Sequence, residues 1–101
     1  MISNSGVVLS FSKDEVALSI CTSETNGPMS FYARVRAVRR ACTNPGKKCT
    51  DICKEQGASF QCFDTVHIYN RSTWKYLEAI RYLSRGCDST SCGPNYCCCG
   101  K

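Results

Sequence analysis

This chain of 101 residues contains ten cysteines, which have the widest range of possible chemical roles of any residue type in it. A cysteine can bind a metal, act as a thiolate nucleophile or form a disulfide. No Cys-x2-Cys spacing occurs and there is a single histidine, so neither a metal site nor a cofactor is predicted. This cysteine density is typical of secreted proteins built on disulfides. We therefore expect a secreted, extracellular protein with five disulfides among Cys21, Cys42, Cys49, Cys53, Cys62, Cys87, Cys92, Cys97, Cys98 and Cys99.

The cysteine spacing indicates which elements are crosslinked. Cys97, Cys98 and Cys99 are consecutive, and adjacent residues bridge only with strain, so each should reach a different distant partner. Cys49 and Cys53 lie one turn apart on a predicted helix, and they should also bridge outward. These two clusters favour a helix crosslinked to a C-terminal strand. The spacing alone leaves the pairing open.

Basic residues form the second candidate for chemistry. The net charge is +5, and the stretch from residue 34 to residue 48 holds six basic residues and no acidic one. Such a cluster favours anionic partners, namely a lipid or cell-wall surface, and each cation near an anionic membrane contributes about 1 kcal/mol. The alternative is a solvated face with no partner. The predicted anionic-surface residues are Arg34, Arg36, Arg39, Arg40, Lys47 and Lys48.

Aromatic side chains could support binding at a membrane boundary, where amphipathic rings are favoured. The alternative is that these rings belong to the core. The candidates are Phe31, Tyr32, Trp74, Tyr76 and Tyr82.

Catalysis is not predicted, and neither is specific recognition of nucleic acid. Asp64 and His67 are three residues apart in a predicted strand, so they lie on opposite faces and cannot form an acid–base pair. No hydrolase, phosphate-loop or metalloprotease signature occurs, and no nucleic-acid reading motif accompanies the charge. His67 is interpreted as a half-buried structural residue. Asn70-Arg71-Ser72 is a glycosylation sequon, which makes Asn70 a modification site if it is used.

The elements that must position these residues begin with a predicted hairpin. Residues 6–12 and 15–21 each alternate apolar and small polar side chains across a charged turn. Residues 25–28 form a breaker cluster. Residues 29–41 fit a strand or a helix, and we favour a strand that becomes irregular near Arg39.

The second half of the chain contains the predicted helices. After a turn at residues 43–46, residues 48–56 predict a short helix that ends at Gly57. Residues 59–63 and 65–69 predict one or two strands, residues 70–73 a turn, and residues 74–83 a helix that stops before Gly86. The tail, residues 87–101, is expected to take its shape from crosslinks and turns more than from burial.

These patterns predict one α+β domain over residues 1–101, small and disulfide-rich, with antiparallel strands and one or two short helices. It would consist of a strand-rich segment, residues 1–41, and a cysteine-rich segment, residues 42–101. No stretch is long and apolar enough for a transmembrane helix or a secretory signal. We therefore interpret the chain as a mature form whose leader has been removed, with Met1 as an addition.

One part of the cysteine frame resembles a known family. Cys42-x6-Cys49-x3-Cys53, followed by Cys92-Gly93-x3-Cys97-Cys98, is similar to the β-defensin-type domain of big defensins, antimicrobial proteins of marine invertebrates. The resemblance implies the pairs Cys42–Cys97, Cys49–Cys92 and Cys53–Cys98. The segment between Cys53 and Cys92 is far longer than in that family, and Cys21, Cys62, Cys87 and Cys99 are additional.

A second resemblance competes with the first. Cys49-x3-Cys53, Gly57, Cys62 and Cys97-x-Cys99 are similar to the cysteine-stabilised αβ motif of invertebrate defensins, macins and scorpion toxins. This resemblance implies that Cys49 and Cys53 bridge to Cys97 and Cys99.

Both resemblances imply a secreted cationic host-defence protein of innate immunity, one that acts on anionic microbial surfaces or membranes. The alternative is a toxin-like extracellular binding module, which docks on a receptor or ion channel through a rigid surface fixed by disulfides. The sequence leaves the oligomeric state open.

Overall fold

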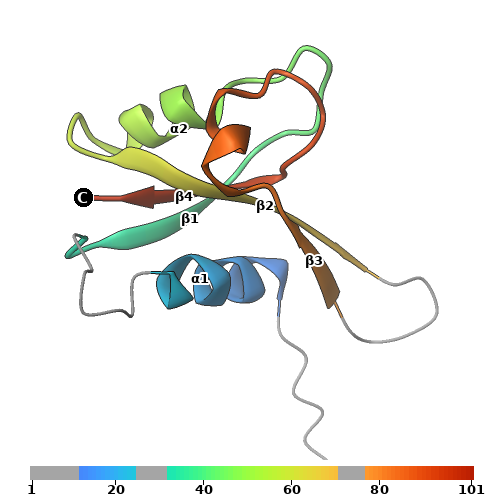
Figure 1. The fold of residues 1–101 in the computed structure, drawn as a ribbon, viewed down its shortest axis with the longest axis horizontal. Coiled ribbons are helices and arrows are strands. Elements are labelled where there is room, and N and C mark those ends of the chain that lie inside the picture. Colours follow the sequence, from blue (N-terminus) through green and yellow to red (C-terminus); the bar gives the residue numbers. More distant parts are fainter. Residues whose placement is uncertain (1–11, 25–31, 71–76) are drawn as a thin grey trace, which may run out of the picture.

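The computed structural model describes residues 12–24, 32–70 and 77–101. Its elements are α1 (Lys13–Ser23), β1 (Val35–Arg39), α2 (Cys49–Gln56), β2 (Gln61–Asn70), β3 (Leu77–Arg81), the 3-10 helix η1 (Leu83–Asp88) and β4 (Tyr96–Gly100). The strands form one antiparallel sheet in the order β1-β4-β2-β3. Helix α1 lies on one face of this sheet and α2 on the other (Figure 1). The fold is thus the predicted small disulfide-rich α+β type.

Strand β4 is the centre of the structure. It pairs with β1 on one side and β2 on the other, and all five of its residues are buried. The expectation that turns and crosslinks rather than burial shape the tail is wrong, because the tail contains this central strand. Successive strand residues point to opposite faces. Cys97 and Cys99 accordingly bridge to α2, whereas Cys98 bridges to α1.

Helix α1 replaces the second strand of the predicted hairpin, so that prediction is wrong. The hydroxyl of Ser12 accepts a hydrogen bond from the Glu15 amide, and the Glu15 carboxylate accepts one from the Ser12 amide. This capping box starts the helix. Its buried residues, Ala17 and Cys21, are one turn apart. Residues 6–11 of the predicted hairpin and the breaker at 25–28 lie outside the described residues.

Helix α2 and strand β1 confirm their predictions. Helix α2 ends at Gly57, whose φ of 156° and ψ of 149° are not left-handed helical but lie in a positive-φ region that favours glycine. It packs on the sheet through Cys49, Ile52 and Cys53. Strand β1 is regular up to Arg39, as the strand interpretation of residues 29–41 predicts.

Strand β2 unites the two predicted strand segments, with a bulge between Cys62 and Asp64. Strand β3 lies where the sequence predicts a helix, so the helix over residues 74–83 is wrong. Leu77–Arg81 pairs with the second half of β2, and this pairing overrides the helix propensity of the segment. Most of the predicted turn at 70–73, together with Trp74 and Tyr76, lies outside the described residues.

Two small cores lie on opposite faces of the sheet. The α2 side is built around Cys49, Ile52, Cys53, Phe60, Cys97 and Cys99. The α1 side is built around Ala17, Val66, Ile68 and Tyr96. Among the described residues no helix is long and apolar enough to cross a bilayer.

Candidate functional site

All ten cysteines form disulfides, and the pairs are Cys21–Cys98, Cys42–Cys92, Cys49–Cys97, Cys53–Cys99 and Cys62–Cys87. The helix-to-strand pairing implied by the cysteine-stabilised αβ motif is present. The β-defensin-type pairing is wrong for all three of its bridges, because Cys97 faces α2 and Cys98 faces α1. With no free thiol, the cysteines supply rigidity and no nucleophile.

Arg40 does not belong to the exposed cationic cluster, contrary to prediction. Its side chain is only 3% exposed, and its guanidinium donates to the carbonyl oxygens of four residues. The distances are 2.6 Å from Nε to Lys47, 2.7 Å from Nη1 to Pro94, and 3.1 and 2.9 Å from Nη2 to Ser89 and Ser91. Arg40 therefore ties the loop before α2 to the loop before β4. Four of its five N–H donors are used within the protein, and its burial keeps it away from an external anion.

Arg39 and Lys47 are exposed but already paired. Arg39 makes a two-point contact with the carboxylate of Asp14 on α1, with N–O distances of 2.8 and 2.9 Å. This contact and a hydrogen bond from the Tyr96 hydroxyl hold the pKa of Asp14 below its usual value. Lys47 forms an ion pair with Glu55 of α2. Each of these cations has its charge balanced by a neighbour.

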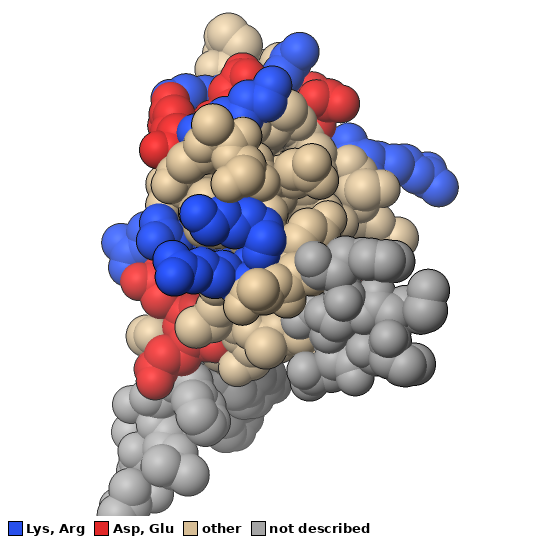
Figure 2. All heavy atoms as spheres, turned by 90° about the vertical axis from the view of Figure 1, so that its left-hand side faces the viewer, with Lys and Arg blue, Asp and Glu red and all other residues tan. Residues whose placement is uncertain are grey.

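Three cations remain together at one end of the sheet, where β1 begins and β4 ends. Arg34 comes directly before β1 and Arg36 is the second residue of that strand, so both lie at this end of the sheet. Lys101 is held beside them by hydrogen bonds between its main chain and that of Arg34, with N–O distances of 3.0 Å. We call Arg34, Arg36 and Lys101 the cationic face. Figure 2 shows basic side chains grouped in the middle of this end of the molecule.

An aromatic ring organises the cationic face. The guanidinium of Arg36 lies 5.0 Å from the centre of the Phe60 ring, and the ammonium of Lys101 lies 5.3 Å from it. Cations are attracted to aromatic faces at such distances. Arg36 also donates to the side-chain oxygen of Gln56, at 3.0 Å. Within the described residues, none of the three cations of this face forms an ion pair with an acidic side chain.

A hollow of about 510 Å³ adjoins the cationic face. Tyr32, Ser59, Gln61, Gly100 and Lys101 line it. The Tyr32 ring stacks on Phe63, with a centroid distance of 4.8 Å, and it lies over Gly100. A side chain at Gly100 would come within 2.6 Å of the Tyr32 ring, so glycine is required for this packing.

The structure thus separates the six predicted surface residues. Arg34 and Arg36 lie on the cationic face, and Lys48 is exposed at the start of α2. Lys101 was missed by the sequence reasoning, because only the pairing of β1 with β4 brings it beside Arg34. Of the predicted aromatics, Tyr32 lines the hollow, whereas Tyr82 lies elsewhere, directly before η1. Phe31, Trp74 and Tyr76 lie outside the described residues.

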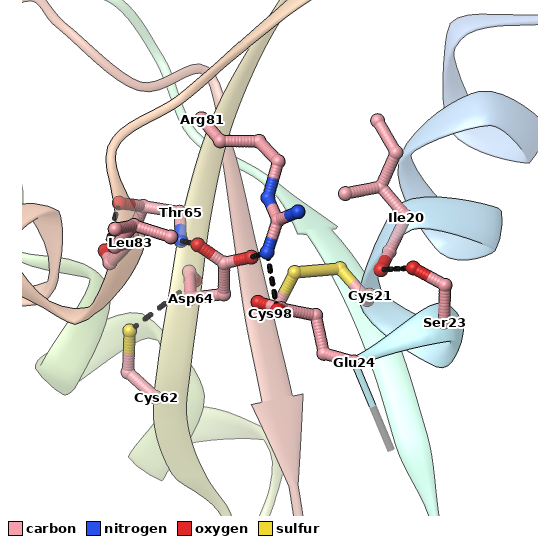
Figure 3. A network of polar contacts seen from close by, with 10 residues as sticks. All are labelled: Ile20, Cys21, Ser23, Glu24, Cys62, Asp64, Thr65, Arg81, Leu83 and Cys98. Atoms are coloured by element: carbon pink, nitrogen blue, oxygen red, sulfur yellow. Dashed lines mark hydrogen bonds and ion pairs between the residues drawn. A yellow bond between two sulfur atoms is a disulfide. The ribbon is translucent and has the colours of Figure 1, made fainter. Parts of the chain in front are cut away.

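The carboxyl of Asp64 is buried, and Figure 3 shows it with its neighbours. Asp64 accepts from the Thr65 amide at 2.8 Å and contacts Arg81 at 3.4 Å, while Arg81 also pairs with Glu24. Burial and the hydrogen bond with Glu24 raise the pKa of Asp64. The hydrogen bond from Asp64 lowers the pKa of Glu24, so Asp64 is the member of this pair that takes up a proton first as the pH falls. This network joins α1 to the sheet.

His67 and Asn70 lie apart from these sites. The His67 ring nitrogen Nδ1 lies 2.6 Å from the Gly93 carbonyl oxygen, which can only accept, so Nδ1 carries the proton. His67 is half-buried, as predicted for a structural residue. Asn70 is exposed at the end of β2. Among the described residues, no group of three His, Cys, Asp or Glu side chains could hold a metal ion.

Comparison with known proteins finds no matching family model, no matching curated protein and no matching solved structure.

Proposed function

We propose that this chain is a secreted cationic host-defence protein that binds anionic microbial surfaces through its cationic face. The observation that carries the proposal is the grouping of Arg34, Arg36 and Lys101 without an acidic partner among the described residues, with Arg36 and Lys101 beside the Phe60 ring. In the part of the chain that the structure describes, no acidic side chain pairs with these three cations. An external anion would supply it.

The strength of this binding follows from the number of free cations. Each lysine or arginine near an anionic membrane contributes about 1 kcal/mol, so three contribute at most about 3 kcal/mol before ordering and screening. The six basic residues predicted from the sequence would together contribute about twice that value. However, Arg40 is buried, and Arg39 and Lys47 are already in ion pairs. We therefore expect weak, reversible, salt-sensitive attachment and no deep insertion.

The disulfide frame supports both secretion and a surface role. Five disulfides are typical of oxidising compartments, and they fix the end of the sheet that carries the cations. The Cys49–Cys97 and Cys53–Cys99 bridges also agree with the resemblance to invertebrate defensins in cysteine spacing. Because cations on a rigid support lose little conformational freedom on binding, the frame favours attachment.

The test is binding to vesicles of phosphatidylcholine, with and without phosphatidylglycerol, at low and physiological salt. The variant Arg34→Gln/Lys101→Gln should bind the anionic vesicles more weakly than the unmodified protein. A matched control is Lys13→Gln/Arg85→Gln, which lowers the net charge equally, from +5 to +3, at cations outside the cationic face. The control should retain most of the binding.

Two results would contradict the proposal. Equal loss in both variants would mean that only total charge matters, and equal binding to neutral vesicles would exclude an electrostatic mode. Growth inhibition of bacteria by the same variants connects binding to defence. A saturable affinity for a receptor that depends on one aromatic side chain, without inhibition of growth, would instead support the extracellular binding module.

A further inference from the structure

A second hollow, of about 500 Å³, lies between η1 and the loop that leads into β4. This volume is typical of pockets that take small organic ligands. The hollow and the cationic face lie at opposite ends of β4, because Pro94 precedes this strand and Lys101 follows it. The hollow is therefore a separate candidate site. Its lining includes Tyr82, Leu83, Arg85, Ser89, Ser91 and Pro94.

The wall formed by Tyr82 and Leu83 is held in place by the buried residue Thr65. The Thr65 carbonyl accepts from the Tyr82 amide and the Thr65 hydroxyl donates to the Leu83 carbonyl, both at 2.8 Å. Leu83 has a φ of 62°, a conformation that is costly for leucine and persists only where its surroundings enforce it. Tyr82 and Leu83 are nevertheless 37% and 50% exposed. A fixed backbone thus presents an aromatic ring and an aliphatic side chain to the hollow.

The wall formed by the loop before β4 is held from inside by Arg40. The Arg40 guanidinium donates to the carbonyls of Ser89, Ser91 and Pro94, and all three residues line the hollow. Cys92, in the same loop, is crosslinked by a disulfide. Because both walls are fixed before a ligand enters, binding costs little conformational freedom.

The charge around the hollow favours an anion. All eight acidic residues of the chain lie in the described part, and none of them lines the hollow or pairs with Arg40 or Arg85. Arg85 is exposed in the lining. Arg40 lies behind the wall, where carbonyl oxygens satisfy its donors but leave its positive charge without an opposite charge. A buried charge is normally paired. An anion in the hollow would balance both cations.

A third arginine of the lining does not add to this positive charge. Arg81 forms ion pairs with Glu24 and with Asp64. Its charge is therefore already balanced within the protein, and Arg85 is the cation of the hollow that is available for contact with a ligand.

We propose that this hollow binds a small organic anion in which a carboxylate is attached to a flat ring. The Arg85 guanidinium offers paired N–H donors that match the two oxygens of a carboxylate. The ring would lie against the Tyr82 ring, in the offset or edge-to-face arrangement that aromatic pairs prefer, and beside Leu83. A bare inorganic ion would leave this apolar wall in contact with water, so the lining favours a ligand with an apolar body. The proposal does not depend on binding at the cationic face.

The test is titration of isotope-labelled protein with benzoate, followed by amide NMR. The amides of Leu83, Arg85 and Gly93 should shift and saturate at millimolar benzoate, whereas that of Lys101 should not shift. Benzamide has the same shape without the charge, and acetate has the charge without the ring. Each should bind about tenfold more weakly than benzoate or worse.

Two variants separate the contributions of charge and ring. Arg85→Gln should weaken benzoate binding about tenfold to a hundredfold, because it removes a charge-assisted hydrogen bond. Lys54→Gln is the matched control: it removes the same charge from an exposed position on α2, and it should bind benzoate like the unmodified protein. Tyr82→Leu should remove the advantage of benzoate over acetate.

Four results would overturn the proposal. The first is the absence of shifts at tens of millimolar benzoate. Equal affinity for benzamide would exclude the anionic group as the basis of binding, and equal affinity for acetate would exclude the ring. Equal weakening by Lys54→Gln and Arg85→Gln would show that only the total charge of the protein matters.

Discussion

Removal of the Arg40 side chain should reduce stability strongly and leave binding to anionic vesicles unchanged. In Arg40→Met the hydrophobic stem is largely retained, but the carbonyls of Lys47, Ser89, Ser91 and Pro94 lose their donor. The bond to Pro94 is buried, and the other three are partly buried. A buried acceptor without a partner costs about 1–3 kcal/mol, and an acceptor that water can reach costs less. The expected total is about 3–5 kcal/mol.

Guanidinium unfolding with the disulfides intact measures this loss. For a denaturant slope of about 3–4 kcal/mol per molar, the midpoint should fall by about 1 M. Arg39→Met is the neighbouring control, since its ion pair with Asp14 is exposed and should contribute little. The reasoning is refuted if Arg40→Met unfolds within the experimental error of the unmodified protein, or if it weakens vesicle binding as much as the change at Arg34 and Lys101 does.

Three further perturbations test other parts of the structure. The pKa of Asp64 is raised by burial to about 6, so the folded state holds an extra proton between about pH 4 and 6, and stability should fall as pH rises through that window. Asp64→Asn should flatten this fall in urea titrations, and an unchanged slope would contradict the assignment. Limited reduction followed by alkylation and peptide mapping should label Cys42 and Cys92 first, because both are exposed, and earlier labelling elsewhere would be contrary. Gly86→Ala would place a methyl group 1.9 Å from the Thr65 hydroxyl, and thermal unfolding should show a loss of about 1–3 kcal/mol, whereas a neutral effect would count against this packing.

The sequence predicts the elements whose local signals agree with their tertiary pairing. Helix α2 has a cysteine pair one turn apart and a glycine after its last turn, and the structure confirms it. In residues 15–21, Val16, Leu18 and Ile20 alternate as in a strand, whereas Ala17 and Cys21 are one helical turn apart. The capping box that selects the helix depends on Ser12 and Glu15. The segment Leu77–Arg81 consists of good helix formers, and only its pairing with β2 makes it a strand.

The sequence predicts the candidate site only in part, because the site also depends on tertiary pairing. Proximity along the chain groups Arg34, Arg36, Arg39 and Arg40, but it does not show on which face of the sheet each side chain lies. In a strand, alternate residues face opposite sides, so Arg36 joins the α2 side and Arg39 the α1 side. The burial of Arg40 depends on carbonyls about fifty residues away, which no local pattern contains.

Consecutive cysteines on a strand constrain pairing more than their spacing alone suggests. If residues 97–99 are extended, the outer two cysteines share a face and the middle one points away. A helix with cysteines one turn apart can then bridge to Cys97 and Cys99 but not to Cys98, which requires a partner from a second layer. Cys21 on α1 is that partner. The additional cysteine in α1 thus explains how β4 is crosslinked to helices on both faces, and why the sheet end that carries the cationic face is rigid.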